Sequence, residues 1–442
     1  MANSTQKSFV ENLYNRVTGD EDARVCKDIP EAACNDQPRN FFSYLIANLL
    51  GKIADEIASA KLIIPWLFGM LSVPTVFAGF LVPIRESGVL LPQLVVAAFI
   101  RRMAIRKTIW LVGAVLSALS LFGMAYAVLN YEGLAAGSAI IITLIVFSLS
   151  RGLCSVSAKD VLGKTVSKSR RGALMGWSAS ISGIAILLIG LWLGTVDLNE
   201  YSLKIFAGLL ISGGIIWILA TLVFETIQEQ PGATEGGGNA FSVAIQQIQI
   251  LKTDASFRSF VTARGLLLSV ALAPPFYVLI AQSSSDGSLL GLGALFIANG
   301  LAGSLSAPFC GYMSDQSSKR VMMIAATGAG TLGIFTFTAV INDLSWAINE
   351  VGLAVIFLIL NIMHGGVRLG RKVYLVDMAT AENRAIYVAL SNTIIGVLML
   401  FGGLVGLIGG YLGAHATILF LGAMSLFAAY YIKFLPDVSE PA

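Results

Sequence analysis

The sequence predicts an all-α membrane protein with twelve transmembrane helices in two pseudo-symmetric six-helix halves. Of its 442 residues, 56% are hydrophobic and only 12% are charged, whereas a soluble domain carries about 25% charged residues. Apolar stretches long enough to span a bilayer recur twelve times. A set of soluble domains would need about twice this charge to cover its surfaces. A net charge of +3 is too small to indicate nucleic-acid binding.

The apolar stretches define the predicted spans, and the basic residues define their orientation. The spans lie near 41–69, 73–100, 109–129, 134–159, 171–196, 203–226, 257–282, 287–314, 319–341, 350–376, 385–409 and 414–433. Of the 29 basic residues, only Lys204 lies in a loop on the side opposite to the others. Because basic loops stay on the cytoplasmic side, we expect a multi-pass protein of the inner (plasma) membrane with both termini in the cytoplasm.

A flexible linker separates the two halves. Residues 228–239 are rich in Gly, Gln and Glu and contain no apolar run. The predicted units are a cytoplasmic tail at 1–40, a six-helix bundle at 41–226, a cytoplasmic linker at 227–256, a second six-helix bundle at 257–433 and a cytoplasmic tail at 434–442.

The two halves repeat each other at a constant offset. The residues Arg151-Gly152, Lys159, Arg171 and Gly183 recur 213 positions later as His364-Gly365, Lys372, Arg384 and Gly396. Internal similarity of this kind is typical of transporters built from repeats.

Two further patterns concern helix packing. Gly402, Gly406 and Gly410 recur at every fourth position, which indicates close contact between helices. Pro274 and Pro275 interrupt the seventh span and are either a hinge or a kink that neighbouring groups tolerate.

One loop resembles a known family. Residues 311–320 read Gly-Tyr-Met-Ser-Asp-Gln-Ser-Ser-Lys-Arg, which matches the Gly-x-x-x-Asp-x-x-small-basic-basic loop of the major facilitator superfamily. The twelve spans and the central linker are similar to that family over nearly the whole chain. The resemblance implies a secondary transporter that works by alternating access, with spans 1, 4, 7 and 10 around a central cavity. In the equivalent loop after span 2, Arg101 stands where the family usually has Asp.

Acidic residues within the spans are candidates for proton coupling. Lys52, Asp55 and Glu56 stand at i, i+3 and i+4 on one helical face, and Glu86 lies in span 2. Because a charge that faces lipid costs at least ~2.5–3.5 kcal/mol at the bilayer centre, these groups should face a wet cavity or one another. One carboxylate then takes up the coupling proton while Lys52 adjusts its pKa, or the three form a static ion-pair cluster.

Basic residues within the spans are candidates for substrate binding. Arg151 and Arg264 are expected to hold an anionic group of the substrate, with Arg85, His364 and Arg368 as further contacts. Spans 1, 2, 4 and 7 carry five basic against three acidic residues, which favours a small organic anion or zwitterion. Two alternatives are efflux of lipophilic cations and, from another class, a non-transporting sensor or scaffold. Against the first, span 5 lacks the Gly-Pro motif usual in drug–proton antiporters of the family.

The resemblance also implies a cytoplasmic gate. Asp315 should approach the start of span 5 near Arg171, because a helix N-terminus favours an anion. In the other half, Arg101 replaces the acid and Asp377 and Glu382 precede span 11, which predicts a gate with swapped charges. The alternative is that Arg101 only contacts lipid headgroups.

The remaining residues exclude several kinds of chemistry. The four cysteines, Cys26, Cys34, Cys154 and Cys310, have no metal-site spacing and are interpreted as free thiols. No catalytic set or nucleotide fold is visible, so we expect no enzyme, no cofactor and no metal site. The expected partners are a small-molecule substrate, protons and the lipid bilayer, with the protein as a monomer.

The orientation can be tested by labelling. Thr234→Cys in the linker and Ser284→Cys after span 7, each in a background without the native cysteines, should react with an impermeant thiol reagent from opposite sides of the membrane. Reaction of the Thr234→Cys variant from outside would reverse the predicted orientation.

Overall fold

The structure is a computed structural model that describes residues 11, 14, 29, 31–92, 96, 99–100, 102–195, 202–232, 249–284, 289–380 and 383–438. The helices of the N-terminal half are α2 (Glu31–Asn35), α3 (Gln37–Ile57), α4 (Ile63–Met70), the 3-10 helix η1 (Thr75–Phe77), α5 (Ala78–Leu90), α7 (Lys107–Asn130), α8 (Gly133–Thr165), α9 (Lys168–Leu193) and α10 (Ser202–Glu225). Those of the C-terminal half are α12 (Ile250–Thr253), α13 (Ala255–Leu266), α14 (Leu268–Leu272), α15 (Pro274–Ser284), α16 (Leu289–Ile341), α17 (Ser345–Ile348), α18 (Glu350–Met378), α19 (Arg384–Gly402), α20 (Val405–Leu412) and α21 (Ala414–Ile432).

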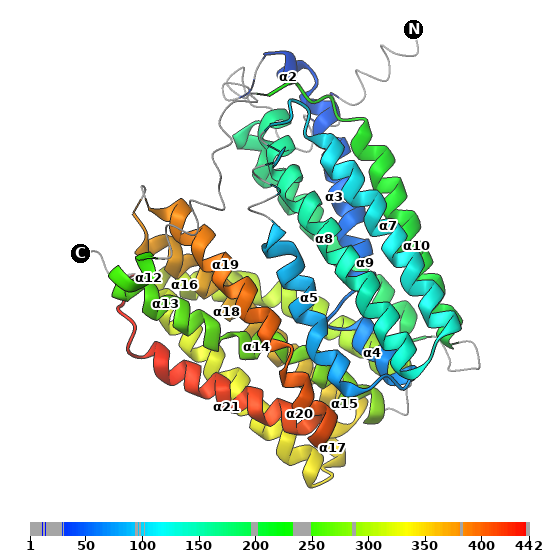
Figure 1. The fold of residues 1–442 in the computed structure, drawn as a ribbon, viewed down its shortest axis with the longest axis vertical. Helices are drawn as coiled ribbons and strands as arrows, with labels where there is room; N and C mark the ends of the chain where they lie inside the picture. Colours follow the sequence, from blue (N-terminus) through cyan, green and yellow to red (C-terminus); the bar gives the residue numbers. More distant parts are fainter. Residues whose placement is uncertain are drawn as a thin grey trace.

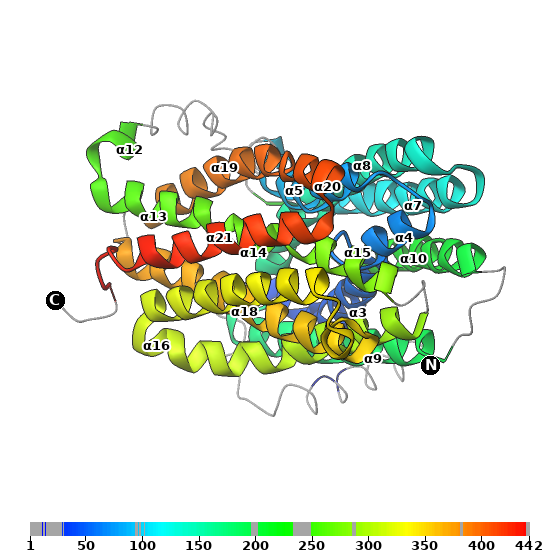
Figure 2. The same cartoon turned by 90° about the horizontal axis from the view of Figure 1, so that it is seen from below.

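The fold class predicted from the sequence is confirmed. Within the described residues, nine helices are long and apolar enough to cross a membrane, and they coincide with predicted spans 3–7 and 9–12. Span 1 corresponds to α3 and α4, span 2 begins with η1 and α5, and span 8 is the first part of α16. The helices form two bundles (Figure 1), and α16 packs against both α18 and α21 in the second bundle (Figure 2). The chain is therefore a multi-pass membrane protein.

The eighth and ninth spans join without a loop. The helix α16 runs through the predicted loop and is interrupted at Ser317, whose φ of −161° and ψ of 105° are not helical. The hydroxyl oxygen of Ser317 accepts a hydrogen bond from the backbone N–H of Arg320 at 3.3 Å. It thus caps the N-terminus of the ninth span in the way that serine usually does.

The two bundles converge at one end of the molecule, which carries α4, η1, α15 and α20, and diverge toward the end that carries α2 and α12 (Figure 1). We call the first the convergent end. There a Cβ atom added to Gly79 of α5 would lie 2.5 Å from Cα of Gly406 in α20, and one added to Gly293 of α16 would lie 2.7 Å from the oxygen of Gly190 in α9. Nearer the middle, the Ser87 hydroxyl donates to the carbonyl of Gly396 at 2.8 Å.

One expectation about the cysteines is wrong. Cys154 and Cys310 are free and buried, as predicted, but Cys34 is disulfide-bonded. Cys26 lies outside the described residues. The spacing rule that was applied tests for metal sites, and it does not test whether two thiols of a tail meet in space.

Candidate transport site

The first span is broken between a long helix and a short one. The helix α3 ends at Ile57 and α4 begins at Ile63, so residues 58–62 are not helical. Proline has no N–H, so Pro65 cannot bond to the carbonyl of Lys61 as residue 65 of a continuous helix would. The N–H of Ile64 instead bonds to Ser59 O at 3.1 Å. Span 7, the equivalent span of the second half, is also divided, into α13, α14 and α15. Broken spans at equivalent positions mark binding sites in transporters.

Asp55, in the last turns of α3, is held by two arginines. Arg151 of α8 grips it with both ends of its guanidinium, Nε lying 2.8 Å from Oδ1 and Nη2 donating to Oδ2 at 2.9 Å. Arg85 of α5 approaches Oδ1 at 3.5 Å. The Arg151 guanidinium also lies 4.4 Å from the ring centroid of Trp217, a cation–π contact that fixes its plane. The guanidinium of Arg151, which we expected to hold the substrate, thus binds Asp55 instead.

Glu56 has a different kind of partner from its neighbour. Its Oε1 accepts a hydrogen bond at 2.8 Å from Nδ2 of Asn299, which belongs to α16 in the opposite bundle. Glu56 forms no ion pair with any residue that the structure describes. Of the two alternatives for Lys52, Asp55 and Glu56, the static ion-pair cluster is not seen, because Lys52 makes no ion pair within the described part of the chain; the role in proton coupling stays a prediction. Cations from other helices take the place of Lys52.

Lys61, in the break of span 1, connects this span to α5 and to α18. Its Nζ lies 3.7 Å from Oε1 of Glu86 in α5 and 3.5 Å from Nε2 of His364 in α18. The contact with His364 joins the two bundles. Helical spacing places Lys61 off the face of Asp55 and Glu56, so the sequence analysis did not include it among the site residues. The unwound backbone at 58–62 is what lets it turn toward α18.

Arg264 is placed away from Arg151 by its partners. It is only 7% exposed in α13, and its guanidinium donates to Ser391 Oγ at 2.5 Å and to Asn392 Oδ1 at 2.9 Å in α19. The two arginines therefore contact different partners in different bundles. The structure does not show them converging on one anionic group, and the shared role remains a prediction.

Most side chains of the predicted gate lie outside the residues that the structure describes. Arg101, Glu382 and the side chain of Asp315 are outside the described residues. Asp377 is exposed at the end of α18, and the guanidinium of Arg171 donates to the carbonyls of Val166 at 2.9 Å and Gly163 at 2.8 Å. The gate with swapped charges stays a prediction.

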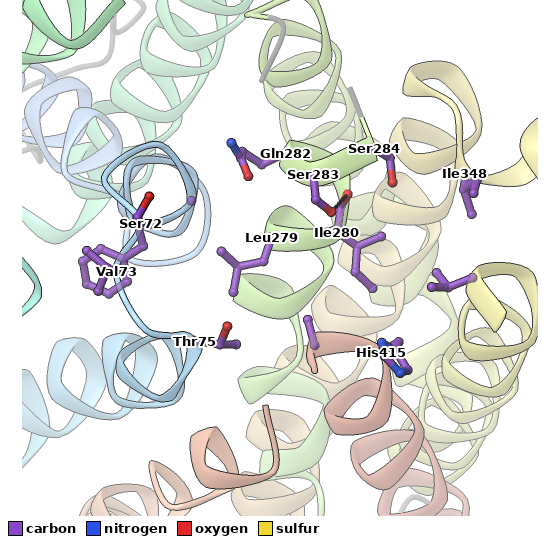
Figure 3. A pocket seen from close by; sticks show the side chains of 14 residues that line it. Ser72, Val73, Thr75, Leu279, Ile280, Gln282, Ser283, Ser284, Ile348 and His415 are labelled. Atoms are coloured by element: carbon purple, nitrogen blue, oxygen red, sulfur yellow. Dashed lines mark hydrogen bonds between the residues drawn. The ribbon is translucent and has the colours of Figure 1, made fainter. Parts of the chain in front are cut away.

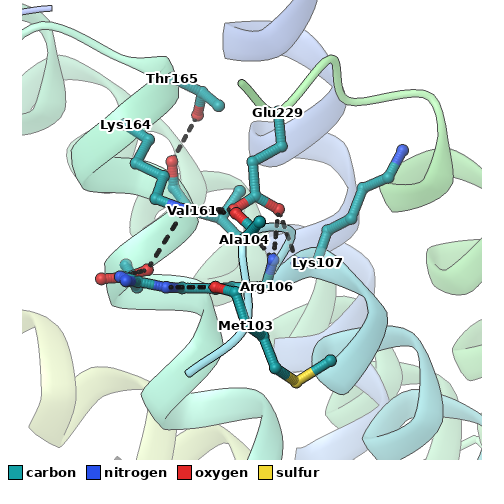
Figure 4. Close-up of polar contacts among 9 residues, drawn as sticks. Met103, Ala104, Arg106, Lys107, Val161, Lys164, Thr165 and Glu229 are labelled. Atoms are coloured by element: carbon teal, nitrogen blue, oxygen red, sulfur yellow. Dashed lines mark hydrogen bonds and ion pairs between the residues drawn. The ribbon is translucent and has the colours of Figure 1, made fainter. Parts of the chain in front are cut away.

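A second polar centre, which the sequence analysis missed, lies where the linker leaves α10 (Figure 4). The carboxylate of Glu229 is fully buried, accepts the backbone N–H of Arg106 and of Lys107 at 2.7–3.0 Å, and contacts Lys164 Nζ at 2.8 Å. It fastens the start of the linker to the turn before α7 and to the end of α8. The role of Glu229 is hard to predict from the sequence, because a glutamate in a polar segment is normally solvated.

Removing the charge of Glu229 should loosen this junction. In Glu229→Gln one carboxylate oxygen becomes an NH2 group that faces backbone donors, so hydrogen bonds to a charged acceptor, worth about 1.5–3 kcal/mol each, are lost. We expect a lower melting temperature for the purified protein. Glu225→Gln, whose side chain is exposed at the end of α10, four residues before Glu229, is the matched control, and equal melting temperatures for both variants would contradict the role of Glu229.

A cavity of about 320 Å³ opens at the convergent end (Figure 3). Ser72, Thr75, Gln282, Ser283 and His415 supply polar groups to its wall, together with apolar side chains of α4, α15 and α21. Both bundles contribute to this wall. The cavity contains no carboxylate and no guanidinium among its lining residues, which separates it from the charged site at the break of span 1.

The two bundles, the broken spans and the charged groups between them define a class of helical membrane protein with a charged interior site. Residues 260–442 match the family model of the Major Facilitator Superfamily. This match for the second half, with the fold of the whole chain, confirms the resemblance to that superfamily. A search of curated protein sequences found no match.

Solved structures with the same fold include several transporters. A mutant of the nucleoside transporter NupG superposes with a TM-score of 0.69 at 12% identity and covers 89% of this chain and 99% of its own. A D-xylose–proton symporter has a TM-score of 0.68 at 15% identity, with coverages of 91% and 100%. A POT family transporter in complex with 5-aminolevulinic acid has a TM-score of 0.69 at 13% identity, with coverages of 94% and 100%.

Proposed function

We propose that this protein is a secondary transporter that moves a small organic anion or zwitterion by alternating access, with the proton as coupling ion and Glu56 as the coupling carboxylate. The observation that carries this proposal is the contact between Glu56 and Asn299. It joins the two bundles through a carboxylate that forms no direct ion pair among the described residues, although Lys61 and Arg85 interact with it at longer range. Similar folds include a proton symporter, which supports the choice of ion.

The contact couples the proton to the movement of the bundles. An ionised Glu56 accepts a charge-assisted hydrogen bond from the Asn299 amide, and such a bond is roughly twice as strong as a neutral one. Protonation removes the charge and weakens the link between α3 and α16. Asp55 is less suited to this role, because it is already engaged in ion pairs with Arg151 and Arg85 of its own bundle.

The charge balance of the site supports an anionic substrate. Lys61, Arg85, Arg151, Arg368 and Arg371 surround three carboxylates, those of Asp55, Glu56 and Glu86. An excess of cations attracts an anion and repels a lipophilic cation. The predicted cytoplasmic location of both termini places the diverging end of the bundles on the cytoplasmic side, so the proposed state is open inward.

The coupling role can be tested in proteoliposomes. A thermal-shift screen of anionic and zwitterionic metabolites identifies a substrate, since a bound ligand raises the melting temperature. Glu56→Gln should then abolish accumulation driven by a proton gradient while leaving exchange of labelled for unlabelled substrate within about twofold of wild type. Glu132→Gln, at an exposed position before α8, controls for a general loss of charge. Accumulation against a gradient by Glu56→Gln would exclude this carboxylate.

A further inference from the structure

One face of α18 carries a row of cations. His364, Arg368 and Arg371 stand at i, i+4 and i+7, a spacing that places them on the same side of a helix. Arg368 is exposed and Arg371 is half-buried. The sequence analysis selected the first two of these residues, and Arg371 continues their row by one turn.

This face is turned toward the N-terminal bundle. Lys61 Nζ lies 3.5 Å from Nε2 of His364 and 3.7 Å from Oε1 of Glu86. Glu86 also interacts electrostatically with Arg368 and Arg371. Arg264, from α13, is a further cation near Arg371. The groups that face one another across the two bundles are thus four cations, Lys61, Arg264, Arg368 and Arg371, and two carboxylates, Glu86 and Glu56, the second of which interacts electrostatically with Lys61.

The two arginines of α18 interact with Glu86 only at longer range. Neither Arg368 nor Arg371 forms a hydrogen bond or an ion pair with a residue in the described ranges. Arginine side chains inside a membrane protein normally pair with carboxylates or carbonyls, because an unpaired charge there is costly. Asp55 shows such pairing with Arg151 in the same structure. The unused guanidinium groups therefore indicate an anion that the substrate brings.

We propose that Lys61, Arg368 and Arg371 bind a phosphate monoester group, so that the transported solute is an organic phosphate. This inference rests on the proposed function and specifies its substrate class. Arginines at i and i+3 project side by side, and each offers a planar fork that matches phosphate oxygens in pairs. A phosphate monoester carries about −1.5 to −2 charges at neutral pH, which offsets the positive charge that remains after Glu86 and Glu56 are counted against Lys61, Arg264, Arg368 and Arg371. A monocarboxylate carries a single negative charge and therefore offsets only one cation.

Binding of inorganic phosphate to the purified full-length protein tests the proposal. The protein is placed in nanodiscs of zwitterionic lipid, and its melting temperature is followed during titration with phosphate, with acetate as comparator at equal ionic strength and pH. We expect a saturable rise with phosphate and none with acetate. Arg368→Gln and Arg371→Gln should each weaken the apparent affinity at least tenfold. Lys372→Gln, at an exposed position beside Arg371 on the same helix, should bind like wild type.

A further variant and several possible outcomes distinguish phosphate binding at these arginines from the alternatives. Arg371→Lys retains the charge without the fork, so it should fold like wild type and still bind phosphate more weakly. Equal shifts with phosphate and acetate, or wild-type affinity in both Arg→Gln variants, would overturn the proposal. So would phospholipid retention that depends on Arg368 while phosphate has no effect, because the ligand would then be a lipid headgroup. If phosphate does not bind but the Glu56 test still shows proton-driven uptake of another anion, only this inference fails.

Discussion

Leucine at Gly406 or at Gly190 will prevent the bundles from closing at the convergent end. A Cβ atom on Gly406 would collide with the backbone oxygen of Val76 in η1, and one on Gly190 would lie 2.7 Å from Cβ of Phe296. Both contacts are between the two bundles. Overpacking of this kind costs about 1–3 kcal/mol, and every ~1.4 kcal/mol changes a population tenfold, so the state seen here becomes a minor one.

The expected effect is symmetric. Gly79 and Gly293, which receive these contacts, are 214 residues apart, and Gly190 and Gly406 are 216 apart, close to the repeat offset of 213. The contact between Gly79 and Gly406 and the contact between Gly293 and Gly190 therefore occupy equivalent positions in the internal repeat. Either substitution should reduce transport by at least tenfold, since alternating access needs both states.

Thiol labelling measures the population of the state that is closed at the convergent end, and it needs no knowledge of the substrate. Ser283→Cys, in the wall of the cavity at the convergent end, should react faster in the Gly406→Leu and Gly190→Leu backgrounds. Gly183→Leu is the matched control, because a Cβ at Gly183 in the same helix α9 meets nothing within 4 Å. Unchanged labelling rates in both leucine variants would show that these glycines do not limit closure.

Asp55→Ala will strongly destabilise the protein. The substitution leaves Arg151 and Arg85 without the carboxylate that holds them, and removal of one partner of a buried pair costs about 3–5 kcal/mol. The side chains of Arg151 and Asp55 are only 18% and 21% exposed, so solvent compensates for part of this loss and the lower end is expected. Glu56→Ala should cost less, because it breaks one hydrogen bond with a neutral amide.

A double mutant separates the pair from general damage. Asp55→Asn with Arg151→Gln removes both charges and should recover part of the stability that Asp55→Asn loses. The measurement is thermal unfolding of purified protein in detergent, with Glu132→Gln as the exposed control. Additive losses in the double mutant would contradict a direct pair between Asp55 and Arg151.

Several elements were predictable because their signals lie along the chain. Hydropathy, proline positions and basic loops report on each segment separately, and the spans found in the structure follow the predicted boundaries to within a few residues. The glycine row at 402, 406 and 410 indicated close packing. Only the structure distinguishes Gly406, which is in tight backbone contact with η1, from Gly410, whose nearest neighbour would lie 3.5 Å away.

The pairing of charges was not predictable in the same way. Lys52 and Asp55 share a helical face, yet Asp55 pairs with Arg151, almost a hundred residues away. Asn299 was not predictable from the pattern of ionisable residues, because its side chain is a neutral amide. Lys61 counted among the basic residues of span 1, but its contacts could not be predicted from a regular helix through 58–62, and Pro65 removes the N–H that such a helix needs there.

The sequence by itself determined the class of fold and predicted the number of spans, the repeat and the set of charges within the spans. These follow from the cost of exposing polar groups to lipid, which acts on each residue according to its position along the chain. Only the tertiary structure decided which charges meet, because helix rotation and the break at 58–62 set the distances between side chains of different spans. Coulomb energies and hydrogen bonds depend steeply on those distances, so Asp55 is held by two arginines while Glu56 is left to Asn299.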